Sequence, residues 1–208
     1  MSESYVFRNI QGEPLKDLDE AKRLWIPPRY RSDAKGLLLT QEEITDCVDH
    51  LAAKINQDYA HVTTENPLIL IGVLNGSVML LPDLMKKLNV PAIEMDTIKV
   101  ESYGGGKTSA GHVRLEKDLG RDLEGVHALV VEDIVDTGRT NQYIMDAILR
   151  PRGPKTLEMI SLLSKPSRRV VDVDVKYVGF VIDDHFVIGY GMDYEQNLRN
   201  LPFVAVMD

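Results

Sequence analysis

The chain has 208 residues, and its 24 lysines and arginines against 32 aspartates and glutamates give a formal net charge of −8. This length can bury one core without disulfides, and an apolar fraction of 44% excludes a disordered chain. Its acidity disfavours holding nucleic acid through phosphate contacts, and the single cysteine, Cys47, excludes an internal disulfide.

Targeting signals are not visible in the sequence. Residues 1–10 lack the basic start and the apolar run of a signal peptide. The longest uncharged stretch, 66–82, is interrupted by Asn75-Gly76 and ends in prolines, which is unlike a membrane helix. We therefore expect a cytoplasmic protein that binds neither membrane nor nucleic acid.

The first clear element follows an irregular arm at 27–35. Thr40 and Glu43 have the spacing of a capping box. Apolar residues then recur at helical spacing through position 55, which predicts a helix. Cys47 lies on the apolar face of this helix, so we interpret it as a core residue rather than a nucleophile.

Beyond this helix, apolar runs alternate with helical segments. Strands are predicted at 68–73, 93–100, 127–131 and 157–163, with helices at 77–88 and 139–149 and a Gly-rich mobile loop at 102–112. Short strands follow at 177–181, 186–190 and 203–206. This order predicts an α/β fold whose parallel-sheet core carries a small appended subdomain.

The segment 130–140 (VVEDIVDTGRT) carries the strongest chemical signal. A buried strand runs into Glu132 and Asp133, and a short turn then opens a helix. Backbone N–H groups, threonine hydroxyls and a glycine in such a turn can cradle a phosphate. A helix-capping surface turn would have a similar sequence, but two adjacent carboxylates repel each other unless a cation or sugar hydroxyls occupy them.

This segment resembles the phosphoribosyl-pyrophosphate-binding motif of the type I phosphoribosyltransferases, in particular the hypoxanthine-guanine branch. Residues 74–77 resemble the family's pyrophosphate loop and residues 102–104 the start of its catalytic loop. Lys165 and the segments 178–180, 186–190 and 193–194 resemble its purine-binding hood. The resemblance implies one domain over 1–208, with a central parallel sheet flanked by helices. The core would span roughly 40–165, and the hood would combine the N-terminal arm with roughly 166–208.

The resemblance also implies the reaction and the role of each site residue. The 5-phosphoribosyl group of phosphoribosyl pyrophosphate would move to N9 of hypoxanthine or guanine, with Asp136 as the general base or acid beside N7. The 5-phosphate would be bound by Ile134, Val135, Asp136, Thr137, Gly138, Arg139 and Thr140, and the ribose by Glu132 and Asp133. The purine would be bound by Lys165, His185, Phe186, Val187 and Asp193, and pyrophosphate by Leu74, Asn75, Gly76, Ser102, Tyr103 and Arg199.

Magnesium is the cofactor that the resemblance implies. Glu132, Asp133 and Asp193 would hold it, since Mg²⁺ needs only one or two carboxylates plus substrate oxygens. Two positions depart from part of the family: Asn75 replaces a lysine of the pyrophosphate loop, and Arg139 replaces a lysine of the phosphate turn while keeping its charge.

Three alternatives remain at this level. Xanthine could be an additional or the main base. The chain could also be a non-catalytic regulator that binds phosphoribosyl pyrophosphate, although it shows no DNA-binding segment. On their own, Lys165, Asp193 and Arg199 could be ordinary surface charges, and Phe186 a core residue. The resemblance further implies a homodimer or homotetramer.

Overall fold

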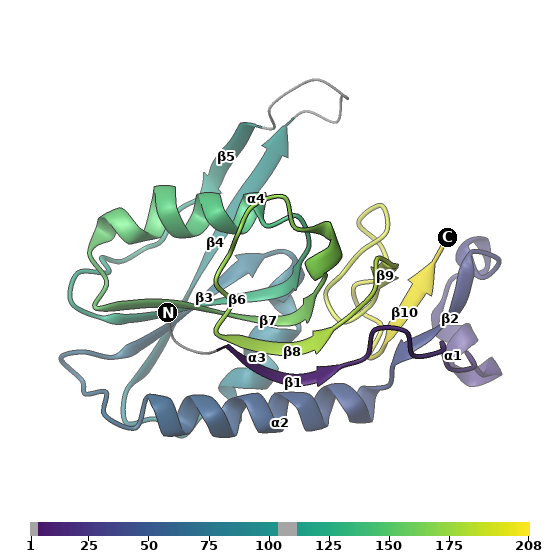
Figure 1. Cartoon of the computed structure of the whole chain (residues 1–208), viewed down its shortest axis with the longest axis horizontal. Helices are drawn as coiled ribbons and strands as arrows, with labels where there is room; N and C mark the ends of the chain where they lie inside the picture. The colour runs from purple at the N-terminus through teal and green to yellow at the C-terminus, as the bar shows by residue number, and fades with distance from the viewer. Residues whose placement is uncertain (1–3, 104–111) are drawn as a thin grey trace.

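A seven-stranded sheet forms the centre of the computed structural model, which describes residues 4–103 and 112–208 (Figure 1). The strand order is β1-β8-β7-β6-β3-β4-β5, and every neighbouring pair is parallel except β4 and β5. Its strands are β1 (Tyr5–Asn9), β3 (Leu68–Leu74), β4 (Ile93–Tyr103), β5 (His112–Lys117), β6 (His127–Val135), β7 (Thr156–Ser164) and β8 (Tyr177–Val181). The predicted α/β fold with a mostly parallel sheet is confirmed.

Helices cover both faces of this sheet (Figure 1). On one face lie α2 (Gln41–Asp58), which begins with the predicted capping box, and the short α3 (Leu80–Met85). On the other face, α4 (Arg139–Gln142) continues as a π-helix over Tyr143–Leu149. The core is accordingly split into two apolar clusters, one on each side of the sheet. Cys47 is fully buried in the cluster under α2, and burial raises the pKa of its thiol.

A second, three-stranded antiparallel sheet of order β2-β10-β9 lies at one end of the central sheet (Figure 1). It consists of β2 (Ala34–Leu39), β9 (Phe186–Ile188) and β10 (Val204–Met207). We call this sheet, with the segments packed on it, the hood. Tyr30 and Leu37 from the N-terminal part share an apolar cluster with Leu201 and Phe203, so both ends of the chain build the hood.

The observed elements differ from the predicted ones in several places. β8 belongs to the central sheet, although residues from about 166 onward were assigned to the hood. The arm predicted at 27–35 contains a 3₁₀ turn at Pro28–Tyr30 and the start of β2, and it follows β1 and α1 (Glu20–Trp25), which were not predicted. The helix predicted at 77–88 is shorter, because a 3₁₀ turn at Gly76–Val78 precedes α3. The loop predicted at 102–112 overlaps β4 and β5 at its ends, and 104–111 lie outside the described residues.

Candidate active site

A pocket of about 200 Å³ lies at the carboxyl ends of the central strands, under the hood. In open parallel sheets this edge is the usual place for a ligand. The pocket is lined by Asp133, Ile134, Asp136, Lys165, Phe186, Val187, Met192 and Asp193. The fold thus assembles residues that the sequence analysis assigned separately to ribose, phosphate and purine.

The adjacent carboxyls of β6 lie in different surroundings. Strand β6 extends through both residues, and successive side chains of a strand point to opposite faces. Glu132 is buried, and within the described part of the chain its Oε2 has no hydrogen-bond partner. Burial and the neighbouring Asp133 raise the pKa of Glu132 well above its usual value. Only Asp133 lines the pocket, so the two groups do not form one paired site.

Asp133 packs against a close junction of two glycines, beside the cis peptide that joins Leu74 to Asn75. A Cβ added to Gly76 would lie 2.1 Å from Asp133 Oδ2, and one added to Gly191 would lie 1.9 Å from the Gly76 carbonyl oxygen. Glycine is therefore required where the pyrophosphate loop, β6 and the hood meet. Burial raises the pKa of Asp133 to about 6, and Asp193 adds to this while Arg199 opposes it.

The phosphate turn after β6 presents unpaired backbone donors. Gly138 has φ +83° and is the N-cap of α4. Among the described residues, the N–H groups of Thr137 and Gly138 donate to no acceptor. Helix geometry leaves the next N–H groups free as well. This arrangement can bind a phosphate, as the segment's sequence predicted.

The segment after β7 holds the phosphate turn in place, a role that the sequence analysis missed. The Val170 N–H donates to the Thr137 carbonyl at 3.1 Å. The Arg169 guanidinium donates to the Val135 and Asp136 carbonyls and, at 2.9 Å, to Ser164 Oγ. The pair Arg168-Arg169, directly after Lys165-Pro166-Ser167, was the available signal, but sequence alone does not show that this segment folds back onto the turn.

The purine end of the pocket combines a buried cation with an exposed aromatic ring. Lys165 is only 6% exposed, and its Nζ lies 3.8 Å from Asp184 Oδ1. The Phe186 ring is 48% exposed and meets Tyr194 edge to face, with ring centroids 5.7 Å apart. A half-exposed phenylalanine offers a face on which a flat base can stack. His185, predicted to bind the purine, does not line this pocket.

Asp193 and Arg199 form an ion pair at 2.6 Å beside Asp133. Arg199 also donates to the Gly191 carbonyl at 2.7 Å, so its guanidinium links residues 191, 193 and 199 of the hood. Ser102 and Tyr103 end β4, and Asn75 is exposed in the pyrophosphate loop.

Divalent-metal binding is best supported by Asp133 and Asp193. Their repulsion contributes to the raised pKa of Asp133, and a hard cation would relieve it. Two carboxylates with substrate oxygens suit Mg²⁺. Glu132 does not line this pocket, so its part in metal binding stays a prediction.

Comparison with known proteins identifies this architecture. A model of the phosphoribosyl transferase domain matches residues 37–195. The chain belongs to the phosphoribosyltransferase family. This phosphoribosyltransferase is 40% identical to the hypoxanthine-guanine phosphoribosyltransferase of Staphylococcus aureus, over 85% of this chain and 95% of the relative. The Staphylococcus epidermidis enzyme of the same name is 41% identical, over 84% of this chain and 94% of the relative.

Solved structures resemble the phosphoribosyltransferase closely. The hypoxanthine phosphoribosyltransferase of S. aureus superposes with a TM-score of 0.78 at 40% identity, covering 85% of this chain and 93% of that one. A mutant of the hypoxanthine phosphoribosyltransferase of Trypanosoma cruzi, in a ternary complex with substrates, gives 0.79 at 40% identity, covering 85% and 97%.

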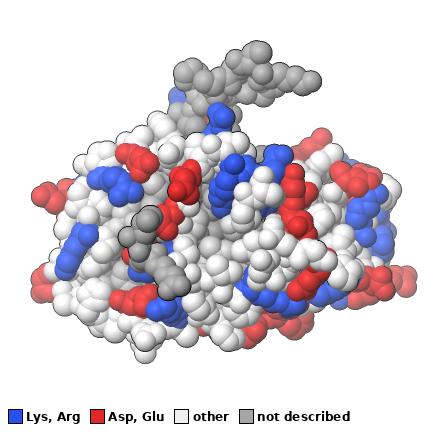
Figure 2. Space-filling view, in the orientation of Figure 1, with Lys and Arg blue, Asp and Glu red and all other residues white. Residues whose placement is uncertain are grey.

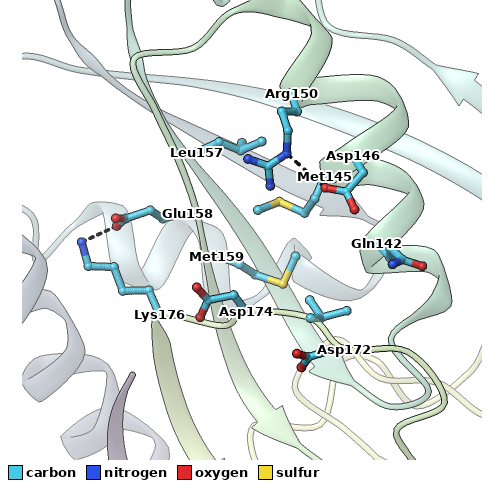
Figure 3. A pocket seen from close by; sticks show the side chains of 11 residues that line it. Gln142, Met145, Asp146, Arg150, Leu157, Glu158, Met159, Asp172, Asp174 and Lys176 are labelled. Atoms are coloured by element: carbon cyan, nitrogen blue, oxygen red, sulfur yellow. Dashed lines mark hydrogen bonds and ion pairs between the residues drawn. The ribbon is translucent and has the colours of Figure 1, made fainter. Parts of the chain in front are cut away.

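A larger cavity of about 360 Å³ lies on the face of the sheet that carries α4, between the π-helix and β7 (Figure 3). None of the predicted site residues lines it. Its two basic residues are already paired, Arg150 with Asp146 and Lys176 with Glu158. This cavity therefore contains none of the groups that the sequence analysis assigned to the substrate.

Proposed function

We propose that this chain catalyses purine salvage, transferring the 5-phosphoribosyl group from phosphoribosyl pyrophosphate to N9 of hypoxanthine or guanine. The products are IMP or GMP and pyrophosphate. The observation that carries this proposal is the pocket in which buried Lys165, exposed Phe186 and Asp136 meet at the end of the phosphate turn. Family membership and the names of the similar enzymes support the same reaction.

Each part of the substrate has a matching group in the pocket. The 5-phosphate accepts hydrogen bonds from the N–H groups and threonine hydroxyls of residues 134–140. The ribose hydroxyls reach Asp133, and the base stacks on Phe186 with its 6-oxo group toward Lys165. The main chain of 74–76 lies where pyrophosphate leaves.

The chemical step forms the bond between N9 and C1′ while the bond from C1′ to pyrophosphate breaks. Positive charge develops on the ribose, and the purine loses its N7 proton. Asp136 takes that proton in our proposal, because its carboxylate lines the purine pocket. Asp133 and Asp193 would hold Mg²⁺, which neutralises charge on the departing pyrophosphate when bound.

The test is nucleotide formation from phosphoribosyl pyrophosphate, magnesium and each base in turn. Hypoxanthine and guanine should be converted, and adenine rejected. The Lys165 ammonium can only donate hydrogen bonds, so it suits a 6-oxo acceptor and is left unpaired by a 6-amino donor. An unmade bond to a buried charged donor costs about 1.5–3 kcal/mol.

Lys165→Gln should therefore lower the preference for hypoxanthine over adenine by about tenfold or more, because an amide both donates and accepts. Lys86→Gln, which changes an exposed lysine on another surface, serves as the matched control. Comparable turnover of adenine and hypoxanthine by the wild type would refute the assignment, and unchanged selectivity in the Lys165 variant would refute the role of this lysine.

The regulator alternative has less support. A regulator that binds nucleic acid needs a basic face. On the face seen in Figure 2, basic and acidic side chains are interspersed instead of segregated. The nucleotide assay also tests the regulator alternative, because a non-catalytic protein forms no nucleotide. Adding xanthine as a fourth base tests whether xanthine is a substrate.

Location and assembly are further parts of the proposal. No helix in the described part of the chain is long and apolar enough to cross a membrane. We propose a cytoplasmic enzyme that forms a homodimer or homotetramer, as the resemblance implies. Light scattering coupled to size-exclusion chromatography measures the assembly.

A further inference from the structure

Four charged side chains of alternating sign run along the rim of the purine pocket. Lys165 Nζ lies 3.8 Å from Asp184, Asp184 lies 3.5 Å from Arg168, and Arg168 Nε donates to Asp136 Oδ1 at 3.1 Å. The chain of charges begins at the group that would recognise O6 of the base. It ends at the group that would take the N7 proton.

A single local turn places both cations of this row. Pro166–Arg168 forms a 3₁₀ helix, closed by the Arg168 N–H donating to the Lys165 carbonyl at 3.1 Å. From this turn, Lys165 and Arg168 both reach Asp184, the first from a buried position in the pocket and the second from its rim.

The contact between Arg168 and Asp136 uses only one carboxylate oxygen. Oδ1 accepts from Arg168, while Oδ2 accepts no hydrogen bond from any described residue. The arginine can thus hold the carboxylate in one orientation and leave its second oxygen for a proton of the base. Asp184 accepts from the other arm of the same guanidinium, at Nη1, and so restrains Arg168 itself.

We propose that Arg168 is a positioning residue for the reaction, which orients the Asp136 carboxylate toward the purine. Asp184 secures Arg168 and, through its second oxygen, lies next to Lys165. The pair thereby couples recognition of the 6-oxo group to acceptance of the N7 proton. This inference rests on the proposed function, because it assumes that Asp136 takes a proton from a bound base.

The effect of replacing Arg168 on catalysis can be measured without an effect on stability. Arg168 and Asp184 are about half exposed, and exposed ion pairs contribute little to stability. Replacing Arg168 should therefore leave the melting temperature unchanged. A loss of turnover in such a variant reports on the orientation of Asp136.

The test compares kcat and KM of Arg168→Gln, Arg168→Lys, Asp136→Asn and the double variant R168Q/D136N, with hypoxanthine as the base. R168Q should lower kcat about tenfold, part of what a positioned base contributes, with KM for phosphoribosyl pyrophosphate changed less than about twofold. R168K should recover part of the loss. In the D136N background the effect of R168Q should fall below about twofold, because no carboxylate remains to be oriented.

D184N completes the set, with R152Q as the matched control. D184N should lower kcat in the wild type and have no further effect in R168Q, since Asp184 acts through Arg168. R152Q breaks the distant ion pair of Arg152 and Asp118 and should leave kcat unchanged. A kcat of R168Q within twofold of wild type would overturn the proposal, as would an undiminished effect of R168Q in D136N. Absence of nucleotide formation by the wild type would instead overturn the proposed function.

Discussion

Asp133 is a carboxyl that the folded protein holds at an energetic cost. It is 8% exposed, and its pKa is raised to about 6 from 3.8, first by burial. The folded state therefore binds the proton more tightly than the unfolded chain does. The free energy of unfolding should fall as pH rises through this interval and stay lower above it.

We expect Asp133→Asn to stabilise the free protein at pH 7.5 while it removes activity. The neutral amide avoids the burial of charge and can still accept the Ile134 N–H. A shift of this size corresponds to at most about 3 kcal/mol, so we expect a gain of about 1–2 kcal/mol. Urea unfolding at pH 7.5 and pH 4 measures it, and the gain should shrink at the lower pH.

Asp146→Asn provides the control, since Asp146 is an exposed member of a surface ion pair and should change stability by less than about 0.5 kcal/mol. A destabilised Asp133→Asn protein at pH 7.5 would contradict the prediction. It would mean that the carboxylate charge is compensated inside the free protein.

Asp136→Asn should lower kcat far more than it weakens binding of phosphoribosyl pyrophosphate. Asparagine preserves the shape of the turn but cannot take a proton, and loss of a positioned base costs about 10²–10⁴ in rate. Steady-state kinetics with isothermal titration of the substrate separates the two effects. A change in kcat below about threefold would assign Asp136 to the turn alone.

The sequence identified individual site residues but not the direction in which each side chain points. Asp136, Lys165 and Phe186 were predicted separately, and the fold brings them into one pocket. Glu132 and Asp133 were treated as a pair because the strand was predicted to end at 131. Once β6 extends to Val135, strand alternation separates them. Arg168 escaped prediction because its partner Asp136 is distant in sequence.

At the scale of the elements, the pyrophosphate loop, β6 and the hood meet at two glycines. Gly191 has φ +101°, and a side chain there would press on the Gly76 carbonyl. The contact fixes the hood against the loop, with Asp133 on the other side of Gly76. The two backbones can approach this closely only because neither Gly76 nor Gly191 has a Cβ.

Gly191→Ala should destabilise the protein by about 2–4 kcal/mol and raise KM for phosphoribosyl pyrophosphate, since both the clash and the backbone angle oppose it. Gly125→Ala is the matched control, because Gly125 also has positive φ, at +73°, but has no atom within 4 Å of an added Cβ. It should cost only about 1 kcal/mol. Thermal melts and substrate titration compare the two, and equal losses would show that backbone strain alone acts.

Elements with a local signal could be predicted well. The capping box at Thr40 marks the start of α2, and continuous apolar runs identify β3, β6 and β7. The misplaced β8 is also buried along most of its length, but its position late in the chain suggested the hood. The short edge strand β1 was missed because its pairing partner β8 lies far along the chain, and no local turn or helix signal beside it marks a strand.

At the scale of the whole molecule, the proposed site is built from both sheets, and we expect it to hold metal only together with its substrate. Mg²⁺ alone should raise the melting temperature by less than about 1 °C, because substrate oxygens supply most of its ligands. With phosphoribosyl pyrophosphate at 100 times its Kd, stabilisation of about 2.7 kcal/mol corresponds to several degrees.

Excess chelator should abolish both this added stabilisation and turnover, and added Mg²⁺ should restore them. Differential scanning fluorimetry and the nucleotide assay follow the two quantities in the same samples. Full turnover in excess chelator would refute the requirement for a divalent cation.

The pairing of the first strands with the last has a consequence for how the chain acquires its structure. Tyr5 pairs with Tyr177, and Ala34 in β2 pairs with Met207 at the very end of β10. During synthesis, the first two strands leave the ribosome long before their partners exist. Pairings of such long sequence separation form slowly, and exposed strands are vulnerable to aggregation meanwhile. The hood, and with it the purine pocket, can close only after β10 has been synthesised.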